Sequence, residues 1–594
     1  MPMMRSHLLI IFCCLCSSIA LELDQPYRDF QVKVPPLTSS EDVPEVCIVT
    51  LLSEHPFRDG QSALFDYSPP TTCSPSTSFS RIQLNITATV NGTQYDRLGL
   101  VFLHDVEIWR YSSSEPTKKG IIWSTIKDVT RYRALFSQEG KMNVLLGNVV
   151  EGPYNGIFRV TVTATFFPET DEEVPSIFQP TPHLFHQVRT PDVFLPLSGP
   201  GGNALSVGSN SVPASQMLTV PRNALSAWME IYASGNGNEE FWYTNVIDAV
   251  APTFQSIGRG PFREVQLYID GQLAGTVFPY AVIYTGGINP LLWRPSASYG
   301  SYDQPTYYID VTPFLGTLTD DAPHNFTLTV RGMGQNSSID DNWFLTGNLQ
   351  VYLSSCEERT TGEMKEYEPG PDTLTPEVLY RFQNNKTAAS VRVATTRSLS
   401  ISAEITSCGN TVEVRYEQYS EYTNFMTISN MGNNQYVDQL TFSKIRSTHG
   451  GKMVYRGDFV YPITVNTSYI SYGGNNGTIL AIVNHGMNSQ SNLPMTEEQV
   501  EIVFQQDGNG SFTLQNGIGV SGTGGQNLVF VYRDSNERSY SRYLEVEQNK
   551  IKSDLAFGTL KDIPSGFSPQ EVDESDSRPF SSFTPRFIRG DLRP

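Results

Sequence analysis

Short segments of alternating apolar and polar residues constrain the fold of this chain more than any other feature. In residues 158–166, Phe, Val, Val, Ala and Phe alternate with Arg and Thr, which is the period of a strand with one buried face. The 46 Gly and 38 Pro supply turns between such runs. Long helical periodicity is absent, and only residues 376–382 are expected to form a helical turn. The pattern predicts an all-β protein made of sandwiches or jelly rolls. Similar runs occur at 82–90, 265–269, 326–330, 349–353, 412–416 and 500–504.

A short motif occurs twice and indicates a duplication. KDVTRY at 127–132 and IDVTPF at 309–314 each come before an alternating run. We therefore expect two jelly-roll or β-sandwich domains side by side, at 45–170 and 185–355. A proline-rich, acidic linker at 171–184 joins them. A third β-rich domain is expected at 356–560, and the tail at 564–594 lacks periodicity and is expected to be disordered.

The N-terminus has the pattern of a signal peptide at residues 1–20. Arg5 is followed by a short apolar run from Leu8 to Cys16 and by small residues before Leu21. The run is too short to span a bilayer, and no later segment is apolar enough to do so. We therefore expect a secreted protein, or one delivered to a vacuolar lumen.

The four cysteines after residue 20 are expected to form two disulfides in that oxidising compartment. Four cysteines allow three connectivities. Pairing of Cys47 with Cys73 and of Cys356 with Cys408 is favoured, because each pair then falls inside one proposed domain.

Eight Asn-x-Ser/Thr motifs also fit a secreted chain with exposed loops. The net charge of −20 and the pI near 4.9 argue against nucleic acid or an anionic membrane as a partner. The expected glycosylation sites are Asn85, Asn91, Asn325, Asn336, Asn385, Asn466, Asn476 and Asn509.

The run Glu239-Glu240-Phe241-Trp242-Tyr243 places two carboxylates against three aromatic residues. Aromatic rings exclude water and raise the pKa of a carboxyl group, and their flat faces suit the apolar face of a sugar. The run by itself is nonetheless more typical of a strand end with solvated acids and buried rings. Trp293 and Arg294 have the same two interpretations, as lining of a sugar site or as packing.

Neither a metal nor a cofactor is expected. His183 and His186 have a spacing that can bind metal, but no further ligand motif accompanies them. A G-x-S-x-G nucleophile motif is also absent.

Several motifs, taken together and in order over residues 45–355, resemble the peptide:N-glycanase A family of secreted plant and fungal glycoamidases. They are VEIWR, KDVTRY, NEEFWYTN, GPFREVQLYIDG, GGINPLLWRP and YIDVTPFLG. The resemblance implies hydrolysis of the amide between asparagine and the innermost N-acetylglucosamine of an N-glycan. The substrates would be N-glycosylated peptides and proteins, the glycan would leave intact as a glycosylamine, and asparagine would become aspartate.

A more distant resemblance, to bacterial peptide:N-glycosidase F, implies the catalytic residues. In that enzyme, two jelly rolls hold acids in the cleft between them. Its aspartate in Trp-Asp-Arg matches Asp96 in Tyr95-Asp96-Arg97, and its glutamate in Ala-Glu-Trp matches Glu240. Asp96 beside Arg97 is expected to stay ionised, and the pKa of Glu240 is expected to be raised. The residues expected to contact substrate are Arg97, Glu239, Trp242, Trp293 and Arg294.

Some alternatives stay open. A third acid of the bacterial enzyme aligns with Asn148, with Glu151 three residues later, and Asp105 or Glu107 would be the cleft acid if the alignment is shifted. A secreted carbohydrate-binding or adhesion protein without activity also fits the acid–aromatic run. A glycosidase is a third possibility, and its product would differ because it leaves a sugar on asparagine.

Overall fold

The computed structural model describes residues 27–35, 46–71, 79–117, 120–168, 190–208, 213–516 and 518–562. The signal peptide, linker and tail expected from the sequence, together with Cys73, lie outside these ranges. The described residues form five β-sheets, which confirms the all-β prediction, and no helix among them is long and apolar enough to cross a membrane. The helical segments have three or four residues each: η1 Thr130–Tyr132, α1 Arg133–Phe136, η2 Gly237–Glu239, η3 Trp242–Thr244, α2 Ala251–Phe254, η4 Pro290–Trp293, η5 Thr312–Phe314, α3 Leu315–Leu318, η6 Gln335–Ser337, η7 Asn384–Lys386 and η8 Asn430–Gly432.

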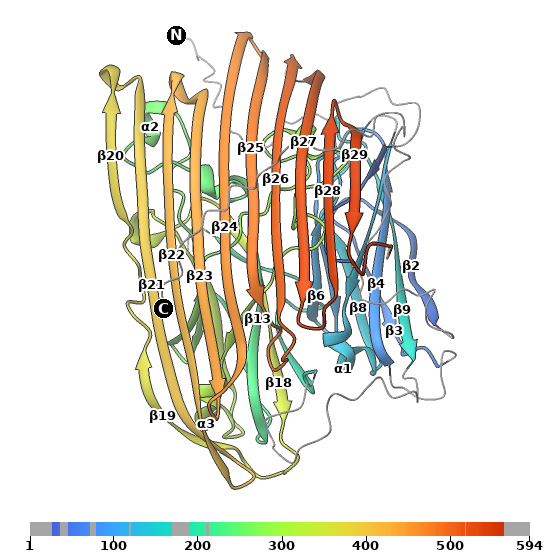
Figure 1. Cartoon of the computed structure of the whole chain (residues 1–594), viewed down its shortest axis with the longest axis vertical. Coiled ribbons are helices and arrows are strands. Elements are labelled where there is room, and N and C mark those ends of the chain that lie inside the picture. The colour runs from blue at the N-terminus through green and yellow to red at the C-terminus, as the bar shows by residue number, and fades with distance from the viewer. Residues whose placement is uncertain are drawn as a thin grey trace.

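The first unit is a sandwich of two sheets, which lies at the right of Figure 1. Their inward side chains, among them Ile82, Leu84 and Ile86 of β4, form one hydrophobic core. One sheet has the order β1-β7-β4-β9-β2, with β1 Tyr27–Asp29, β7 Ile121–Asp128, β4 Phe79–Val90, β9 Phe158–Pro168 and β2 Cys47–Phe57. The other has the order β3-β8-β5-β6, with β3 Ser62–Tyr67, β8 Gly140–Leu146, β5 Leu98–Leu103 and β6 Val106–Ser112.

The second unit is a sandwich of the same design. One sheet has the order β10-β18-β13-β16, with β10 Val193–Leu197, β18 Asn342–Leu353, β13 Ala224–Asn236 and β16 Tyr307–Asp310, and β11 Leu205–Gly208 pairs with β18. The facing sheet has the order β12-β17-β14-β15, with β12 Ala214–Leu218, β17 His324–Arg331, β14 Glu264–Ile269 and β15 Gln272–Val277.

The strand orders of the two sandwiches correspond one to one. The order β7-β4-β9-β2 in the first matches β16-β13-β18-β10 in the second, and β3-β8-β5-β6 matches β12-β17-β14-β15. The repeated Asp-Val-Thr motif occupies the same place in both, at the end of β7 and of β16. In each copy the threonine N–H donates to the aspartate two residues earlier, Thr130 to Asp128 and Thr312 to Asp310, both at 2.9 Å. The structure therefore supports a duplication.

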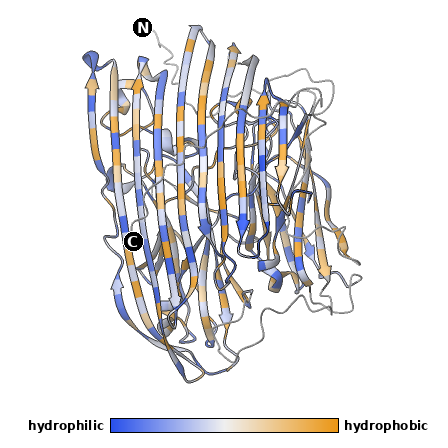
Figure 2. Cartoon of the chain, in the orientation of Figure 1, coloured by the Kyte–Doolittle hydropathy of each residue, from blue (hydrophilic) through white to orange (hydrophobic). Residues whose placement is uncertain are grey.

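The third unit is one antiparallel sheet of eleven strands, not another sandwich. It faces the viewer in Figure 1, and the alternation of hydropathy along its strands is visible in Figure 2. The expected helical turn at 376–382 is wrong, because these residues form β20 and pair with β21. The strands are β19 Thr361–Glu368, β20 Glu377–Gln383, β21 Ala388–Ser407, β22 Asn410–Ser429, β23 Asn434–His449, β24 Lys452–Gly473, β25 Asn476–Ser491, β26 Val500–Gln515, β27 Ile518–Asp534, β28 Ser539–Glu547 and β29 Lys550–Phe557.

The long sheet shares its core with the second sandwich. Val391, Ile401 and Val465 of the sheet belong to the same cluster as Leu267 and Phe326. Within this contact Arg397 forms a buried ion pair with Glu264, at 2.8 and 3.0 Å. Because one side of the sheet needs this apolar cover, we expect the sheet and the second sandwich to fold together.

A second buried ion pair fixes the two sandwiches against each other. Arg110 of β6 donates to both carboxylate oxygens of Glu107, at 2.7 Å each. The same guanidinium reaches across to Ser234 Oγ at 3.1 Å and to the carbonyl of Phe344 at 2.7 Å. Thr346 Oγ1 in turn donates to Glu107. This pair is therefore part of the interface.

The covalent framework agrees with the sequence where it is described. Cys356 and Cys408 form the expected disulfide, with their Cα atoms 5.7 Å apart. Cys47 is disulfide-bonded, and its expected partner Cys73 lies outside the described residues. Among the expected glycosylation sites, the side chains of Asn91, Asn336, Asn385, Asn466 and Asn509 are exposed, and those of Asn85, Asn325 and Asn476 are half-buried.

Substitution of Arg110 by Met tests the interface. The variant leaves the Glu107 carboxylate buried without its partner, which costs about 3–5 kcal/mol of unfolding free energy. Chemical denaturation measures this cost. Arg533→Met is the matched control, since its ion pair with Glu501 at 3.3 Å is exposed and is worth at most about 1 kcal/mol. The double variant Arg110→Met/Glu107→Gln should recover most of the lost stability. Equal costs for Arg110→Met and Arg533→Met would contradict the proposed role of the buried pair.

Candidate functional site

Four loops at equivalent ends of the two sandwiches bring the candidate residues together. Asp96 lies between β4 and β5, and Glu240 lies in the matching connection between β13 and β14. Glu115 lies between β6 and β7, and Gly286 to Arg294 occupy the matching connection between β15 and β16. In the first sandwich, Leu98 at the start of β5 pairs with Ser112 at the end of β6, so the loops before β5 and after β6 lie at the same end. In the second sandwich, Val265 near the start of β14 pairs with Val277 at the end of β15, with the same consequence.

Asp96 and Glu115 form a pair of acids on either side of Gly286. The N–H of Gly286 donates to Asp96 Oδ2 at 2.6 Å. A Cβ atom at Gly286 would lie 2.2 Å from Glu115 Oε2 and 3.3 Å from Asp96 Oδ2. Any larger residue would therefore collide with the pair. Asp96 is half-buried and reaches solvent, whereas Glu115 is only 1 % exposed.

The surroundings of the two acids give them different pKa values. Burial raises the pKa of Asp96 to about 6, although the Gly286 N–H and Arg97 oppose the rise. Burial, and then the charge of Asp96, raise the pKa of Glu115 to about 8. Near neutral pH the first acid is therefore ionised and the second holds a proton. This agrees with the expectation that Asp96 stays ionised, although desolvation outweighs the positive charge of Arg97 and raises the pKa.

Arg294 lies behind this pair. It donates to the carbonyl of Glu115 at 3.0 Å, and its charge lowers the pKa of Glu115. Asp29 of β1 shares this environment: burial raises its pKa to about 7, while hydrogen bonds from Tyr302 and Ser114 and the charge of Arg294 oppose the rise. Arg294 is buried, so it acts on the acids and not directly on solvent.

Glu240 approaches the same turn from the second sandwich. Its charge, after burial, raises the pKa of Tyr284 to about 12, and Tyr284 precedes Gly286 by two residues. Phe241 Cε1 would lie 3.3 Å from a Cβ at Gly287. Trp293 is buried and supports the turn by donating to the carbonyl of Gly287 at 2.8 Å. The structure thus puts Asp96 and Glu240 beside one turn, from two different domains.

The structure assigns Glu239 and Trp242 to packing. Glu239 is fully buried and accepts from Arg263, from Trp343 Nε1 at 2.8 Å and from the Asp340 N–H at 2.8 Å. Although burial opposes ionisation, these partners hold the pKa of Glu239 below its ordinary value. Trp242 is buried against Trp343. Neither side chain is available to a substrate here, so the initial acid–aromatic run divides into a structural Glu239 and a half-exposed Glu240.

Arg97 lies beside Asp96 and is held in place. Its guanidinium donates to Gln94 Oε1 and lies over the ring of Tyr95, 5.6 Å from the centroid. A positive charge is therefore positioned next to the half-buried carboxylate.

The alternative acids have other places. Asn148 is buried and donates to the carbonyls of Phe57 and Gly156, both at 2.9 Å, while Glu151 is exposed. Asp105 lies in the β5–β6 turn, at the opposite end of the first sandwich, and Glu107 is held by Arg110. Glu115 is the acid that sequence reasoning missed. It follows three serines in a loop, and nothing local distinguishes it from a solvated surface acid.

Within the described ranges, no group of three or more His, Cys, Asp and Glu side chains is arranged to hold a metal ion. His183 and His186 lie outside those ranges. The site is thus described by its acids, its guanidinium groups and the backbone of the Gly286–Gly287 turn.

Comparison with known proteins gives two family matches. Residues 35–370 match the family described as peptide N-acetyl-beta-D-glucosaminyl asparaginase amidase A, and residues 390–463 match the C-terminal domain of the same family. The chain is 32 % identical over 524 residues to peptide-N4-(N-acetyl-beta-glucosaminyl)asparagine amidase A of Prunus dulcis, covering 85 % of this chain and 88 % of that protein.

Two solved structures are also similar. PNGase F of Flavobacterium meningosepticum has 14 % identity and a TM-score of 0.33, and the match covers 52 % of this chain and 96 % of that one. PNGF-II has 12 % identity and a TM-score of 0.31, with 56 % and 64 % covered. From the family matches and the Prunus relative, this chain belongs to the peptide-N4-(N-acetyl-beta-glucosaminyl)asparagine amidase A family.

Proposed function

We propose that this chain is a glycoamidase that hydrolyses the amide between asparagine and the innermost N-acetylglucosamine of N-glycans. The family membership supports the reaction class. The observation that carries the assignment to this site is the Asp96–Glu115 pair, whose two pKa values are raised to about 6 and about 8. A carboxylate that ionises near pH 6 next to a buried acid that stays neutral can act as a general base near neutral pH.

The chemistry follows from the positions of the groups. Asp96 is half-exposed and ionised near neutral pH, so it takes the proton of the water that attacks the amide carbonyl. Arg97 beside it stabilises the negative oxygen of the tetrahedral intermediate. Glu240 approaches the same turn from the second sandwich and is the proposed general acid, whose protonated form supplies the proton that the departing nitrogen takes up. Collapse of the intermediate leaves aspartate on the peptide and releases the glycan as a glycosylamine.

Glu115 acts through Asp96 and is buried away from the substrate. Its neutral form adds no second charge next to the base, so the negative oxygen of the intermediate is not repelled. Arg294 and Trp293, both buried, position the loop that holds the pair. None of these steps routes a proton through a metal or cofactor.

We also propose that the protein is exported and glycosylated. The sequence of residues 1–20, the disulfide between Cys356 and Cys408 and the exposed asparagines of five sequons support this.

The products of a defined N-glycopeptide test the reaction. We expect the peptide to lose the whole glycan and to carry aspartate at the former site, which mass spectrometry measures. A peptide that keeps one N-acetylglucosamine would identify a glycosidase, and binding without cleavage would favour the carbohydrate-binding alternative. EDTA should leave the rate of cleavage unchanged. A loss of activity on chelation would show that a metal takes part.

Substitution of the two proposed catalytic acids should remove activity without unfolding the chain. Asp96→Asn keeps the hydrogen bond to Gly286 but lacks the basic charge, and Glu240→Gln lacks the acidic proton. Each should lower kcat/KM by at least about a hundredfold, with an unchanged melting temperature. Glu239→Gln is the matched control: it should lower the melting temperature because it weakens the buried pair with Arg263. A folded Asp96→Asn variant with near-normal activity would overturn the assignment.

The pH profile should show both acids of the pair. Activity should rise with pH as Asp96 ionises, with its midpoint near the pKa of about 6. It should fall again near pH 8 as Glu115 ionises. Because the two groups interact, the profile reports pKa values of the pair. Glu115→Gln stays neutral, so it should keep the rise near 6 and lose the fall near 8.

Stability gives an independent check on Glu115. The pKa of Glu115 is about 8 in the folded chain, against an ordinary value of 4.5. The stability that the protonated Glu115 contributes is therefore fully present below pH 4.5 and is lost as the pH rises through about 8. Denaturant unfolding at pH 5 and pH 8 should show a larger loss for the natural chain than for Glu115→Gln. An equal pH dependence in both proteins would count against a buried, protonated Glu115.

A further inference from the structure

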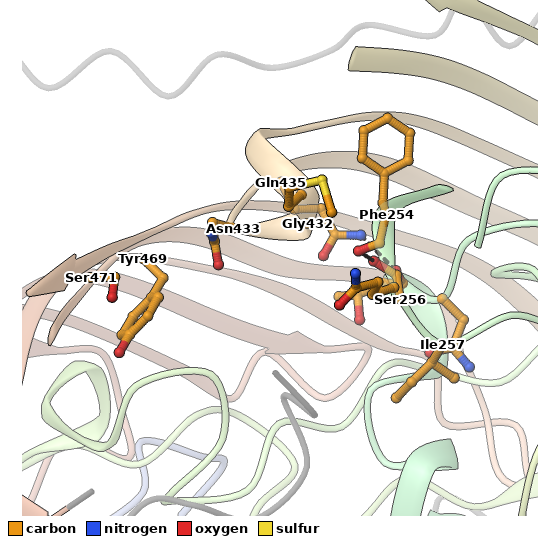
Figure 3. Close-up of a pocket in the computed structure, with 12 residues that line it drawn as sticks. Phe254, Ser256, Ile257, Gly432, Asn433, Gln435, Tyr469 and Ser471 are labelled. Atoms are coloured by element: carbon orange, nitrogen blue, oxygen red, sulfur yellow. Dashed lines mark hydrogen bonds between the residues drawn. The ribbon is translucent and has the colours of Figure 1, made fainter. Parts of the chain in front are cut away.

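A pocket lies where the loop that follows Glu240 meets the inner face of the long sheet. Its volume is about 240 Å³. In Figure 3, Asn433 and Tyr469 extend from the sheet toward the loops, whereas the ring of Phe254 points away from them. The residues that line the pocket are Thr244, Asn245, Phe254, Gln255, Ser256, Ile257, Met431, Gly432, Asn433, Gln435, Tyr469 and Ser471.

The chemistry of this lining is polar but uncharged. Eight of the twelve residues carry an amide or a hydroxyl group, and none carries a formal charge, in a chain whose net charge is −20. Amide and hydroxyl groups offer both donors and acceptors. Sugar hydroxyls have the same dual character, so the lining matches a neutral saccharide better than an ion or a charged peptide.

Two amide groups in the lining lack partners. The Asn245 side chain is 2 % exposed, and its Nδ2 finds no hydrogen-bond acceptor within the described ranges. Asn433 Oδ1 is also buried and finds no donor in the same part of the chain. A buried polar group without a partner costs about 1–3 kcal/mol. Both residues line the pocket, so a bound hydroxylated ligand would lie next to these two amide groups.

Hydrogen bonds to backbone carbonyls and one close backbone approach shape the pocket before a ligand binds. Gln435 Nε2 donates to the carbonyl of Thr244 at 2.7 Å, and the Tyr469 N–H donates to the carbonyl of Asn433 at 2.8 Å. Gly432 has a φ of 89°, and a Cβ there would lie 2.6 Å from the Phe254 carbonyl. The turn between β22 and β23 therefore sits directly on the segment that contains α2, and little ordering is needed on binding.

The pocket is joined to the acid site on two sides. Thr244 Oγ1 donates to the carbonyl of Phe241 at 2.8 Å, and Phe241 contacts the Gly286–Gly287 turn. The four residues from Glu240 to Thr244 span at most about 14 Å. On the sheet, Tyr469 pairs with Ile479, and Ile479 packs against the cluster formed by Leu291 of η4 and Phe512. A glycan of several sugars attached at the acid site is long enough to reach the pocket.

We propose that this pocket binds a sugar unit of the substrate glycan that is remote from the scissile amide. The proposal rests on the glycoamidase function proposed above and adds a saccharide subsite formed partly by the long C-terminal sheet. It gives a role to the amide and hydroxyl groups that the sheet and the loop present to one another in this pocket.

The test compares two glycopeptides with the same peptide. One carries a complete N-glycan, and the other is trimmed to the two innermost N-acetylglucosamines. In the double variant Asn245→Leu/Asn433→Leu, kcat/KM for the complete glycan should fall about tenfold, as expected for two lost hydrogen bonds. The rate on the trimmed substrate should stay unchanged. The melting temperature should hold or rise, because the variant removes two unpartnered buried groups.

Asn424→Leu is the matched control on the same face of the sheet. Its Nδ2 donates to the carbonyl of Tyr243 and to Gln439 Oε1, both at 3.1 Å, so the variant should lose stability and affect both substrates alike. Equal rates of the double variant and the natural chain on the complete glycan would overturn the proposal. An equal loss of rate on the complete and the trimmed substrate would show that the pocket does not contact the remote sugars and would also overturn it.

A binding measurement separates this proposal from the proposed function. The free, complete oligosaccharide should bind the natural chain in calorimetry and should bind the double variant about tenfold more weakly. If the chain cleaves neither glycopeptide, the glycoamidase proposal fails, and this measurement still decides the pocket. Equal binding by both proteins would contradict the subsite whatever the enzymatic result.

Discussion

The buried ion pair between Arg110 and Glu107 is the main charged contact that holds the two sandwiches, and with them the candidate residues, in one arrangement. This pair belongs to the first sandwich, yet its remaining hydrogen bonds go to Ser234, Phe344 and Thr346 of the second. A buried charge needs a complete set of partners, so the two sandwiches have one orientation in which these groups are satisfied. That orientation sets the loop of Asp96 beside the loop of Glu240.

The duplication explains why a site forms at this interface. Each sandwich contributes the connection after its fourth strand and the connection after its sixth, since β4 corresponds to β13 and β6 to β15. The two copies have diverged in length: Glu115 lies in a short loop, and the equivalent segment from Phe278 to Thr306 carries the Gly286 turn, η4 and Arg294. The longer copy covers the acids and removes them from water, which raises their pKa values.

The long sheet supports this arrangement from a third side. Leu291 of η4 packs on Phe512, and Gly522 and Gly524 of β27 lie close to the side chain and carbonyl of Leu291. Any side chain at those glycines would push η4, and with it the turn that touches Asp96 and Glu115. The C-terminal unit is thus part of the structural support of the site, beyond being an appended domain.

The sequence by itself determined the all-β class and the family, because these follow from local periodicity and from motifs in order, and it favoured the two duplicated units and the disulfide between Cys356 and Cys408. It also selected Asp96 and Glu240, which the structure brings to one turn. Only the tertiary structure decided that Glu239 is buried with Arg263, that Trp293 supports a turn, and that Glu115 is the partner of Asp96. Those roles depend on desolvation and on contacts between residues up to about two hundred positions apart, and local sequence does not encode either.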